Sequence, residues 1–402
     1  MATYAFFNVP AWGHVNPTLA IVQELVARGH AVSYYLPEEF RATVEATGAT
    51  FQPYVSRIGH AWTKGFADTE KGGGIIRTIL ADKETVGPQI IDRLRAERPD
   101  VIIYGYMCSW AKGVAEELAV PAISTRATYA SNDHFDAFRD MRTRLQGAAI
   151  LEEFSKLSGA NAEHDSSPSS PQAELLRLTA VVEPLNIIVM SSIFQPLQET
   201  FDDRYLFIGT SILPRHQESD FPFDQLDRNR PLLYISLGSI MTNQPAFYKL
   251  CFEAFGDQPW QVVLPIGRHT DRAQLEPVPS NFILAPSVPQ LEILPRTRLF
   301  VTHAGTNSIM ESLFFGVPMV LIPQQPEQYM HALRAVELGL GVQLDKNTLT
   351  ASALRQAVES VADNSSYQEQ AHHVQNIVQA DGGYQRAVDA IIQFTRTHAK
   401  HS

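Results

Sequence analysis

Short apolar runs, each bounded by Gly, Pro or Asn, recur along this 402-residue chain and constrain its fold more than any other feature. The runs are near-continuous in Val, Ile, Leu, Tyr and Phe, which is typical of strands buried on both faces of a parallel sheet. Helix-like stretches separate them. The clearest is residues 16–28, where Asn16 suits the N-cap and Pro17 the first turn. Alternating strand and helix predicts doubly wound α/β sheets. The predicted strands are residues 4–9, 32–36, 101–104, 122–124, 186–190, 232–237, 261–265, 299–302, 319–322 and 341–344, and further predicted helices are residues 308–315, 328–338 and 351–362.

The alternation of strand and helix occurs twice, on either side of a polar segment at residues 209–230 that contains Pro214 and Pro222. Such a segment is typical of an interdomain linker. We therefore predict two Rossmann-like doubly wound domains, residues 1–208 and residues 231–383. Sheets of this type bind ligands at the carboxyl ends of their strands, so two domains facing across a cleft would place their ligands in that cleft.

Composition excludes several classes of protein. Lys and Arg number 32 against 43 Asp and Glu, giving a net charge of -11, so no general attraction to nucleic acid or anionic lipid is expected. Two cysteines, Cys108 and Cys251, are too few for a disulfide scaffold or a cysteine zinc site. No stretch reaches the roughly 18 apolar residues of a membrane span, and the first residues lack a targeting signal. We expect a cytoplasmic protein without membrane insertion.

The most informative turn follows the strand predicted at residues 299–302. His303 stands at the carboxyl end of that strand, and Gly305 permits a tight turn. Asn307 and Ser308 then begin a helix, where free amides and the positive end of the helix dipole favour an anion. One turn on, on the same side, Glu311 can accept hydrogen bonds from sugar hydroxyls. The pattern suits a nucleoside diphosphate with its ribose, although Asn and Ser in such a turn can also simply cap the helix.

Further motifs occur along the chain in a fixed order. They are GHVNP at residues 13–17, SLGS at 236–239, QPAFY at 244–248, SVPQ at 287–290, GVP at 316–318 and EQ at 327–328. With the turn after residue 302, they make the chain resemble the nucleotide-sugar-dependent glycosyltransferases of the GT-B fold. More narrowly, it resembles their bacterial macrolide and flavonoid branch. The resemblance covers essentially the whole chain. It also implies that the final helix, residues 384–402, packs back on the N-terminal domain.

The resemblance implies a role for each matching residue. The second domain would bind the donor and the first the acceptor, with His14 as the general base that removes the acceptor hydroxyl proton. Imidazole suits this role because its ordinary pKa of about 6.5 lies near working pH. The chain contains no Asp-x-Asp, so the leaving diphosphate would be stabilised by the helix N-terminus and neighbouring side chains, without a metal or other cofactor. His303, Asn307, Ser308 and Ser239 would contact the phosphates, Gln290 and Glu311 the ribose, Val288 the base through its backbone, and Glu327 and Gln328 the transferred sugar.

Three positions depart from the family pattern. Gly105 stands where an Asp usually orients the catalytic His, Ser287 replaces a Trp that stacks on the base, and Glu327 replaces an Asp. Ser109, Tyr106, a carboxylate from elsewhere or a water could replace the missing Asp. Alternatively, an acidic phenol would need little help from the base. We expect Gly105→Asp to raise kcat on alcohol acceptors.

These features predict an inverting glycosyltransferase that uses a UDP-sugar, with UDP-glucose as the leading donor and TDP-sugars next. The acceptor would be a hydroxyl on a hydrophobic small molecule such as a flavonoid, phenol, macrolide or terpenoid, bound by loops within residues 55–150. Two alternatives remain open. A nucleotide-sugar-binding protein with weak or lost catalysis is suggested by Gly105 and Ser287. A sugar-nucleotide epimerase would need acid–base carboxylates around the donor and no acceptor pocket.

Overall fold

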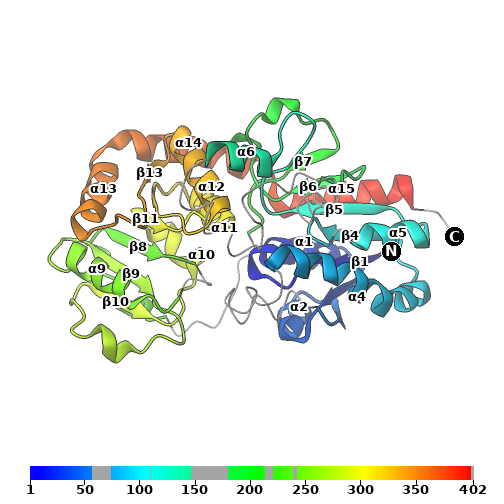
Figure 1. The fold of residues 1–402 in the computed structure, drawn as a ribbon, viewed down its shortest axis with the longest axis horizontal. Coiled ribbons are helices and arrows are strands. Elements are labelled where there is room, and N and C mark those ends of the chain that lie inside the picture. The colour runs from blue at the N-terminus through cyan, green and yellow to red at the C-terminus, as the bar shows by residue number, and fades with distance from the viewer. Residues whose placement is uncertain (57–73, 109, 146–179, 213–220, 239–241, 400–402) are drawn as a thin grey trace. The chain divides into compact units, whose positions relative to one another are not determined.

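The computed structural model describes residues 1–56, 74–108, 110–145, 180–212, 221–238 and 242–399, and it divides into two compact units. Unit 1 comprises Met1–Ile212 together with Asp381–Ser402, and unit 2 comprises Leu213–Ala380 (Figure 1). Each unit contains one sheet in which every pair of neighbouring strands is parallel. The predicted class, doubly wound α/β, is therefore confirmed for both units.

Unit 1 has a seven-stranded sheet in the order β3-β2-β1-β4-β5-β6-β7. Its strands are β1 (Thr3–Phe7), β2 (Ala31–Leu36), β3 (Thr50–Pro53), β4 (Val101–Gly105), β5 (Ala122–Arg126), β6 (Asn186–Ile188) and β7 (Tyr205–Phe207). Its helices are α1 (Trp12–Ala27), α2 (Arg41–Glu45), α4 (Gly74–Glu97), α5 (Trp110–Leu118), α6 (Ala137–Arg144) and α15 (Gly383–His398). The strand order reverses between β1 and β4, which makes their carboxyl ends the expected ligand-binding edge.

Unit 2 has a six-stranded sheet in the order β10-β9-β8-β11-β12-β13. Its strands are β8 (Leu232–Ser236), β9 (Gln261–Pro265), β10 (Phe282–Ala285), β11 (Leu299–Thr302), β12 (Met319–Leu321) and β13 (Gly341–Gln343). Its helices are α9 (Pro245–Phe255), α10 (Gln290–Ile293), α11 (Thr306–Phe315), α12 (Pro326–Glu337), α13 (Ala351–Asp363) and α14 (Ser365–Ala380). Here the order reverses between β8 and β11, so the equivalent edge lies at Ser236 and Thr302.

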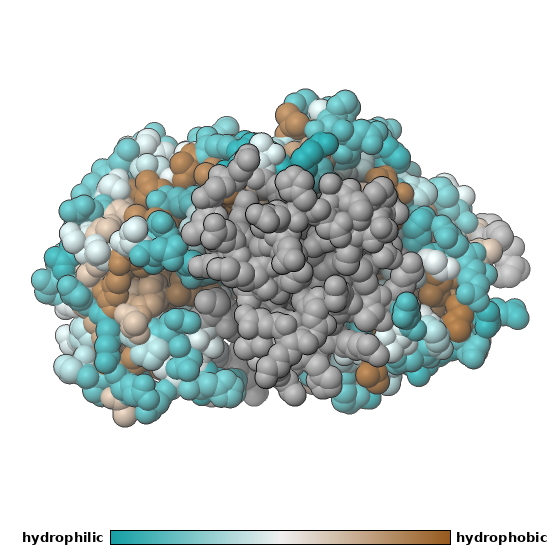
Figure 2. Space-filling model, in the orientation of Figure 1, coloured by the Kyte–Doolittle hydropathy of each residue, from teal (hydrophilic) through white to brown (hydrophobic). Residues whose placement is uncertain are grey.

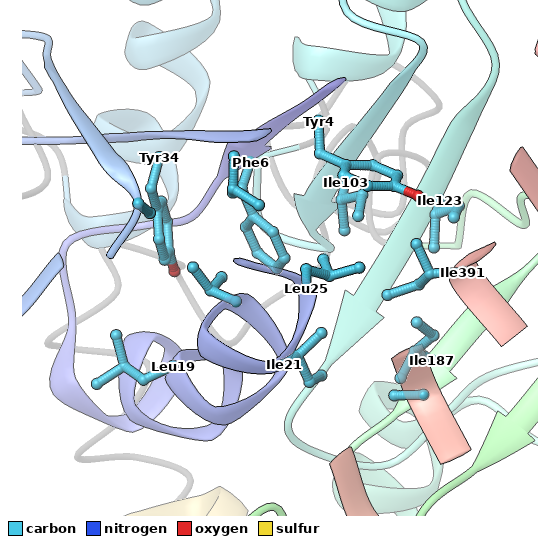
Figure 3. Packing of buried hydrophobic residues seen from close by; sticks show 14 of the residues in the cluster. Tyr4, Phe6, Leu19, Ile21, Leu25, Tyr34, Ile103, Ile123, Ile187 and Ile391 are labelled. Atoms are coloured by element: carbon cyan, nitrogen blue, oxygen red, sulfur yellow. The ribbon is translucent and has the colours of Figure 1, made fainter. Parts of the chain in front are cut away.

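Apolar clusters cover both faces of the unit 1 sheet, because successive strand residues point to opposite sides. Tyr4 and Phe6 of β1 pack with α1 and α15, whereas Ala5 and Phe7 pack with α4 and α5. The C-terminal helix α15 is thus part of the unit 1 core. Figure 3 shows Ile391 of this helix beside side chains of β5 and β6. Burial on both faces explains why these strands are continuously apolar in sequence.

Three strands were missed by the sequence analysis, and all three lie at sheet edges: β3, β7 and β10. Strand β3 buries a single residue, Phe51, and is not continuously apolar, and β7, of which only Phe207 is buried, is an apolar run of just three residues. By contrast, β10 is buried throughout, and its apolar run could have been recognised.

The start of α1 was also predicted wrongly. The helix begins at Trp12 with Ala11 as its N-cap, and Pro17 lies inside it rather than in its first turn. The amides of His14 and Val15 both donate to the carbonyl of Ala11, at 2.9 Å each. The helix therefore starts without the side-chain cap predicted at residue 16, and His14 belongs to its first turn.

In the described ranges, no helix combines the length and apolarity needed to cross a membrane. Hydrophilic residues dominate the coloured surface in Figure 2, with hydrophobic residues scattered among them.

Candidate active site

The turn between β11 and α11 forms a potential anion site in unit 2. The N-cap of α11 is Gly305, which has no side chain to cap the amides of the first turn. Ala304 has φ +64°, a strained left-handed conformation for a residue other than glycine. Its amide donates to Thr302 Oγ1 at 3.3 Å, and its carbonyl accepts a hydrogen bond from His331 Nδ1 at 3.2 Å. These contacts hold the turn in its strained shape and leave the helix N-terminus suited to an anion.

The His303 ring is packed against the backbone of two glycines. A Cβ atom at Gly305 would lie 2.4 Å from His303 Nε2, and one at Gly238 would lie 2.7 Å from the same atom. Gly238 follows β8 and has φ +83°, so it also needs glycine for its backbone conformation. The two glycines follow β8 and β11, the two strands that flank the reversal of the sheet. The ring is therefore fixed at the expected ligand-binding edge.

His303 is a neutral group at physiological pH. Its removal from water lowers its pKa to about 4, against an opposing hydrogen bond that the ring donates to the backbone of Ser236, and the neighbouring His331 adds to the lowering. A neutral imidazole can donate one hydrogen bond to a phosphate oxygen but brings no positive charge. Any anion bound here would depend mainly on oriented N–H groups rather than on a cation.

Gln290 and Glu311, both expected at the ribose, lie in direct contact. Gln290 Nε2 donates to Glu311 Oε2 at 2.6 Å, joining the start of α10 to the second turn of α11. Tyr234 of β8 donates its hydroxyl to Gln290 Oε1 at 3.1 Å and so fixes the orientation of the amide. The carboxylate keeps acceptor capacity for hydroxyl groups. The sequence analysis missed Tyr234, although a buried tyrosine in a strand usually has a hydrogen-bond partner for its hydroxyl.

Four further residues predicted to contact the phosphates or the base lie around the same edge of unit 2. Ser308 is buried in the first turn of α11, whereas Asn307 is partly exposed. Ser287 is exposed and Val288 partly exposed in the loop before α10. Ser239 lies outside the described residues, and the direct contacts of these residues with a donor stay a prediction.

The pair predicted to bind the transferred sugar begins α12. Glu327 is exposed, and Gln328 Oε1 accepts hydrogen bonds from the amides of Gln324 and Gln325, at 2.8 and 3.2 Å. Gln328 therefore has a structural role as part of a capping box. Its amide nitrogen can still donate to a hydroxyl.

In unit 1, His14 lines a small pocket at the reversal between β1 and β4. Its ring centroid lies 5.8 Å from that of Tyr106, one of the residues proposed to replace the missing Asp. Ser109, another such residue, lies outside the described part of the chain. The pocket is lined by Asn8, His14, Thr18, Gly105, Thr125, Arg126, Ala127 and Val189.

The space beside Gly105 is occupied by the side chain of Asn8. A Cβ atom at residue 105 would lie 2.4 Å from Asn8 Oδ1. Asn8 is 1% exposed, and its Nδ2 donates to the carbonyl of His14 at 2.8 Å. Its Oδ1 accepts from the amide of Val9 at 3.0 Å. An amide thus fills this space and holds the backbone of the His14 turn. The sequence analysis missed Asn8, which is an isolated polar residue directly after a strand.

Metal ligands and buried cations complete the description of the site. Across the ranges that the structure describes, no three His, Cys, Asp or Glu side chains gather where they could hold a metal ion. Arg126, also missed in the sequence, ends β5 and contributes a buried guanidinium to the pocket of His14.

Comparisons with known proteins agree with the geometry. A model of the family described as UDP-glucoronosyl and UDP-glucosyl transferase matches residues 216–382. NDP-glycosyltransferase YjiC of Bacillus subtilis (strain 168) is 37% identical over 396 residues, which cover 98% of each chain. Oleandomycin glycosyltransferase of Streptomyces antibioticus is 32% identical over 410 residues, which cover 97% of this chain and 90% of its own. The solved structure of CalG4, the calicheamicin glycosyltransferase, matches with a TM-score of 0.80 at 28% identity, covering 98% of each chain.

The resemblance inferred from the sequence motifs is therefore confirmed by relatives that match nearly the whole chain. This chain belongs to the UDP-glucoronosyl and UDP-glucosyl transferase family and is a glycosyltransferase of the GT-B fold.

Proposed function

We propose that this glycosyltransferase transfers a sugar, with UDP-glucose as the leading donor, to a hydroxyl group of a hydrophobic small molecule. The names of its relatives, which include oleandomycin glycosyltransferase, support a natural product such as a macrolide, flavonoid, other phenol or terpenoid. The reaction inverts the configuration at the anomeric carbon and needs no metal ion.

One observation carries the donor assignment: the Gly238–His303–Gly305 packing stands beside the Gln290–Glu311 pair at one edge of unit 2. The first supplies N–H donors at a helix N-terminus, which suit a diphosphate. The second supplies a carboxylate and an amide, which suit ribose hydroxyls. Together they match the two halves of a nucleoside diphosphate.

The proposed mechanism is a direct displacement. The acceptor oxygen forms a bond to the anomeric carbon while the bond from that carbon to the diphosphate oxygen breaks. His14 takes the proton of the acceptor hydroxyl, and the leaving nucleoside diphosphate carries away the bonding electron pair. The amides at the start of α11 and the neutral His303 ring stabilise the charge on the leaving group.

The test is an assay of the purified protein with UDP-glucose and a mixed panel of phenols and alcohols, read by product mass and by the anomeric configuration of the product. We expect β-linked glucosides whose formation is unaffected by EDTA. UDP release without any acceptor would favour a hydrolase, and conversion of UDP-glucose to an epimeric UDP-sugar would favour an epimerase. Donor binding by calorimetry with no product from any acceptor would favour the alternative that Gly105 suggests, a nucleotide-sugar-binding protein without catalysis.

A further inference from the structure

A chain of hydrogen bonds runs along one face of β8 and ends at the carboxylate expected to bind the ribose. Tyr234 and Ser236 are two residues apart in this strand, so their side chains lie on the same face of the sheet. The amide of Gly238 donates to Ser236 Oγ at 3.2 Å, and the Ser236 side chain forms a hydrogen bond with the Tyr234 hydroxyl. Tyr234 donates to Gln290 Oε1 at 3.1 Å, and Gln290 Nε2 donates to Glu311 Oε2 at 2.6 Å. We call these five residues the β8 relay.

The hydrogen bonds of the β8 relay can run in one direction only. An ionised carboxylate accepts hydrogen bonds and donates none, so the amide nitrogen of Gln290 must face Glu311 and its oxygen must face Tyr234. The Tyr234 hydroxyl must therefore donate to Gln290, and the Ser236 hydroxyl must donate to Tyr234. Burial raises the pKa of the Tyr234 hydroxyl above its ordinary value, so the phenol keeps its proton at physiological pH. Hydrogen bonds aligned in this way polarise and strengthen one another.

Packing fixes the Tyr234 ring in the middle of the relay. Tyr234 is 2% exposed, and its ring stacks on that of Phe300 with the centroids 4.7 Å apart and the planes 13° apart. Phe300 is also its direct partner in the register of β8 and β11. In a close-packed interior the ring cannot turn away from Gln290 without disturbing this pair. The Tyr234 hydroxyl is therefore a rigid support for a long side chain that would otherwise sample several rotamers.

The other end of the relay lies at the turn expected to bind the phosphates. Gly238 packs on the His303 ring, and that ring donates a hydrogen bond to the backbone of Ser236. In the strand register Ser236 pairs with Thr302, the last residue of β11. The relay therefore joins the two halves of the proposed donor site, and Tyr234 lies between them.

We infer that Tyr234 is a positioning residue that gives the donor site its selectivity for ribose over deoxyribose. By holding the Gln290 amide, it holds the Glu311 carboxylate where ribose hydroxyls can donate to it. A carboxylate that is oriented before the donor arrives loses less freedom on binding, so each ribose hydroxyl contributes more to the affinity. Because TDP carries deoxyribose, the same residue favours UDP-sugars over TDP-sugars. The inference rests on the proposed function, in which the Gln290–Glu311 pair binds the ribose.

The experiment measures nucleotide binding by calorimetry in variants that differ by one hydroxyl. UDP, 2′-deoxy-UDP and 3′-deoxy-UDP are each titrated into wild type and Tyr234→Phe. Tyr248→Phe is the matched control, because Tyr248 is also 2% exposed in unit 2 and its hydroxyl donates to the carbonyl of Ile266 at 3.2 Å. Gln290→Ala, alone and combined with Tyr234→Phe, shows whether Tyr234 acts through Gln290. Thermal unfolding checks the folding of each variant.

We expect wild type to bind UDP about 10- to 100-fold more tightly than the more weakly bound deoxy nucleotide, the range for a hydrogen bond to a charged group. Tyr234→Phe should narrow this ratio by about three- to tenfold, the effect of one ordinary hydrogen bond. It should also raise KM for UDP-glucose without lowering kcat by the same factor. Tyr248→Phe should lose a similar amount of stability but keep the wild-type ratio. Tyr234→Phe should change the ratio little further in Gln290→Ala.

An unchanged ratio in Tyr234→Phe, or the same narrowing in Tyr248→Phe, would overturn the inference and leave the proposed function intact. Full narrowing by Tyr234→Phe in the Gln290→Ala background would also overturn it, because Tyr234 would then not act through Gln290. If Tyr234→Phe does not fold, Gln290→Ala decides, since an unchanged ratio there excludes any role of the relay in binding the ribose.

Wild type alone separates the inference from the function on which it rests. Equal binding of all three nucleotides would show that the Gln290–Glu311 pair does not bind the ribose, which overturns the inference while UDP binding still supports a nucleotide-sugar donor. No binding of UDP by wild type would contradict the proposed function itself.

Discussion

Both units have a histidine near the point where the strand order of the sheet reverses, but different residues surround it. In each sheet the strand order reverses near the centre, between β8 and β11 in unit 2 and between β1 and β4 in unit 1. In unit 2 two glycines allow the His303 ring to pack directly on backbone. In unit 1 one glycine, Gly105, leaves space that the Asn8 side chain fills.

The difference separates two ways of positioning a histidine. His303 is fixed through its ring, which the two glycines and the strained turn hold in place. His14 is held through its backbone, because Asn8 binds the His14 carbonyl rather than the imidazole. A ring fixed by packing suits a permanent hydrogen-bond donor. A ring left facing a pocket suits a group that must take a proton from different acceptors.

The largest effect is expected for His14→Ala. Loss of the general base should lower kcat by about 10²–10⁴-fold. The affinity for UDP should be unchanged, because the proposed donor contacts all lie in unit 2. Steady-state kinetics and calorimetry measure the two quantities. His134→Ala, which removes an exposed histidine of unit 1, is the matched control and should behave as wild type. Unchanged turnover in His14→Ala would exclude the proposed base.

The next largest effect is expected for Gly305→Ala, which tests the fixed ring of unit 2. Gly305 has φ -65°, so alanine fits its backbone, but the new Cβ would lie 2.4 Å from His303 Nε2. The ring must move, and we expect a loss of about 1–3 kcal/mol in the free energy of unfolding. The displaced ring should also weaken the binding of UDP by roughly tenfold, which corresponds to about 1.4 kcal/mol of binding free energy.

Two further variants show whether the ring is the cause. Gly113→Ala is the control, because its Cβ would meet nothing within 4 Å and alanine favours a helix. The double variant with His303→Ala should recover stability but not UDP affinity. Full UDP affinity in Gly305→Ala would show that the packing of His303 does not matter for the donor.

The variant Gly105→Asp is expected to lower the stability of the protein without raising kcat. The sequence analysis predicted a gain in kcat on alcohol acceptors. In the structure, however, the Asn8 side chain occupies the space that the new side chain needs. Asn8 is buried and bonded to Val9 and His14, so its displacement should destabilise the protein by about 1–3 kcal/mol. Thermal unfolding and kcat on an alcohol acceptor measure the outcome.

The double variant Asn8→Ala with Gly105→Asp sharpens this test. Removal of the Asn8 amide frees space for the carboxylate, so any gain in kcat should appear in the double variant and not in Gly105→Asp alone. A gain in the single variant would mean that Asn8 moves at little cost. The comparison between the two units would then lose its basis in unit 1.

Much of the fold was predictable because it depends on local patterns. Central strands that are buried on both faces can be recognised in the sequence as apolar runs. An edge strand such as β3 buries one residue and cannot be recognised in this way. The start of α1 was predicted wrongly because Asn16-Pro17 has the residues of a typical helix start. The helix instead begins at Trp12 without any side-chain cap.

The candidate site likewise contains residues that could be predicted from local patterns and residues that could not. The donor turn was readable because His303 to Glu311 lie within nine residues of one another, in one strand–turn–helix. The residues that support the site could not be predicted from the sequence, because each contacts a partner that is distant in sequence. Asn8 meets Gly105 across the β1–β4 pair, Tyr234 reaches Gln290, and His331 reaches Ala304. No local pattern encodes such contacts, because strand order and register determine them.

The smallest expected effect is a dependence of stability on pH that His303 contributes. Its pKa is about 4 in the folded protein against about 6.5 for an ordinary imidazole. The unfolded chain therefore binds more protons between these values, and stability falls as pH drops from about 6.5 toward 4. Because His303 is a partly exposed residue, we expect no more than about 1 kcal/mol from it. Urea unfolding at pH 5 and pH 7.5 measures the difference in wild type and in His303→Gln.

The glutamine variant keeps an amide donor but cannot titrate, so its stability should fall less between pH 7.5 and pH 5 than that of wild type. His331, whose pKa burial also lowers, contributes in the same direction, so the dependence should shrink in His303→Gln without vanishing. An identical loss in both proteins would mean that His303 is readily protonated in the folded state. The packing against Gly238 and Gly305 would then not keep the His303 ring from protons, and the contrast between the two histidines would fail where it is most direct.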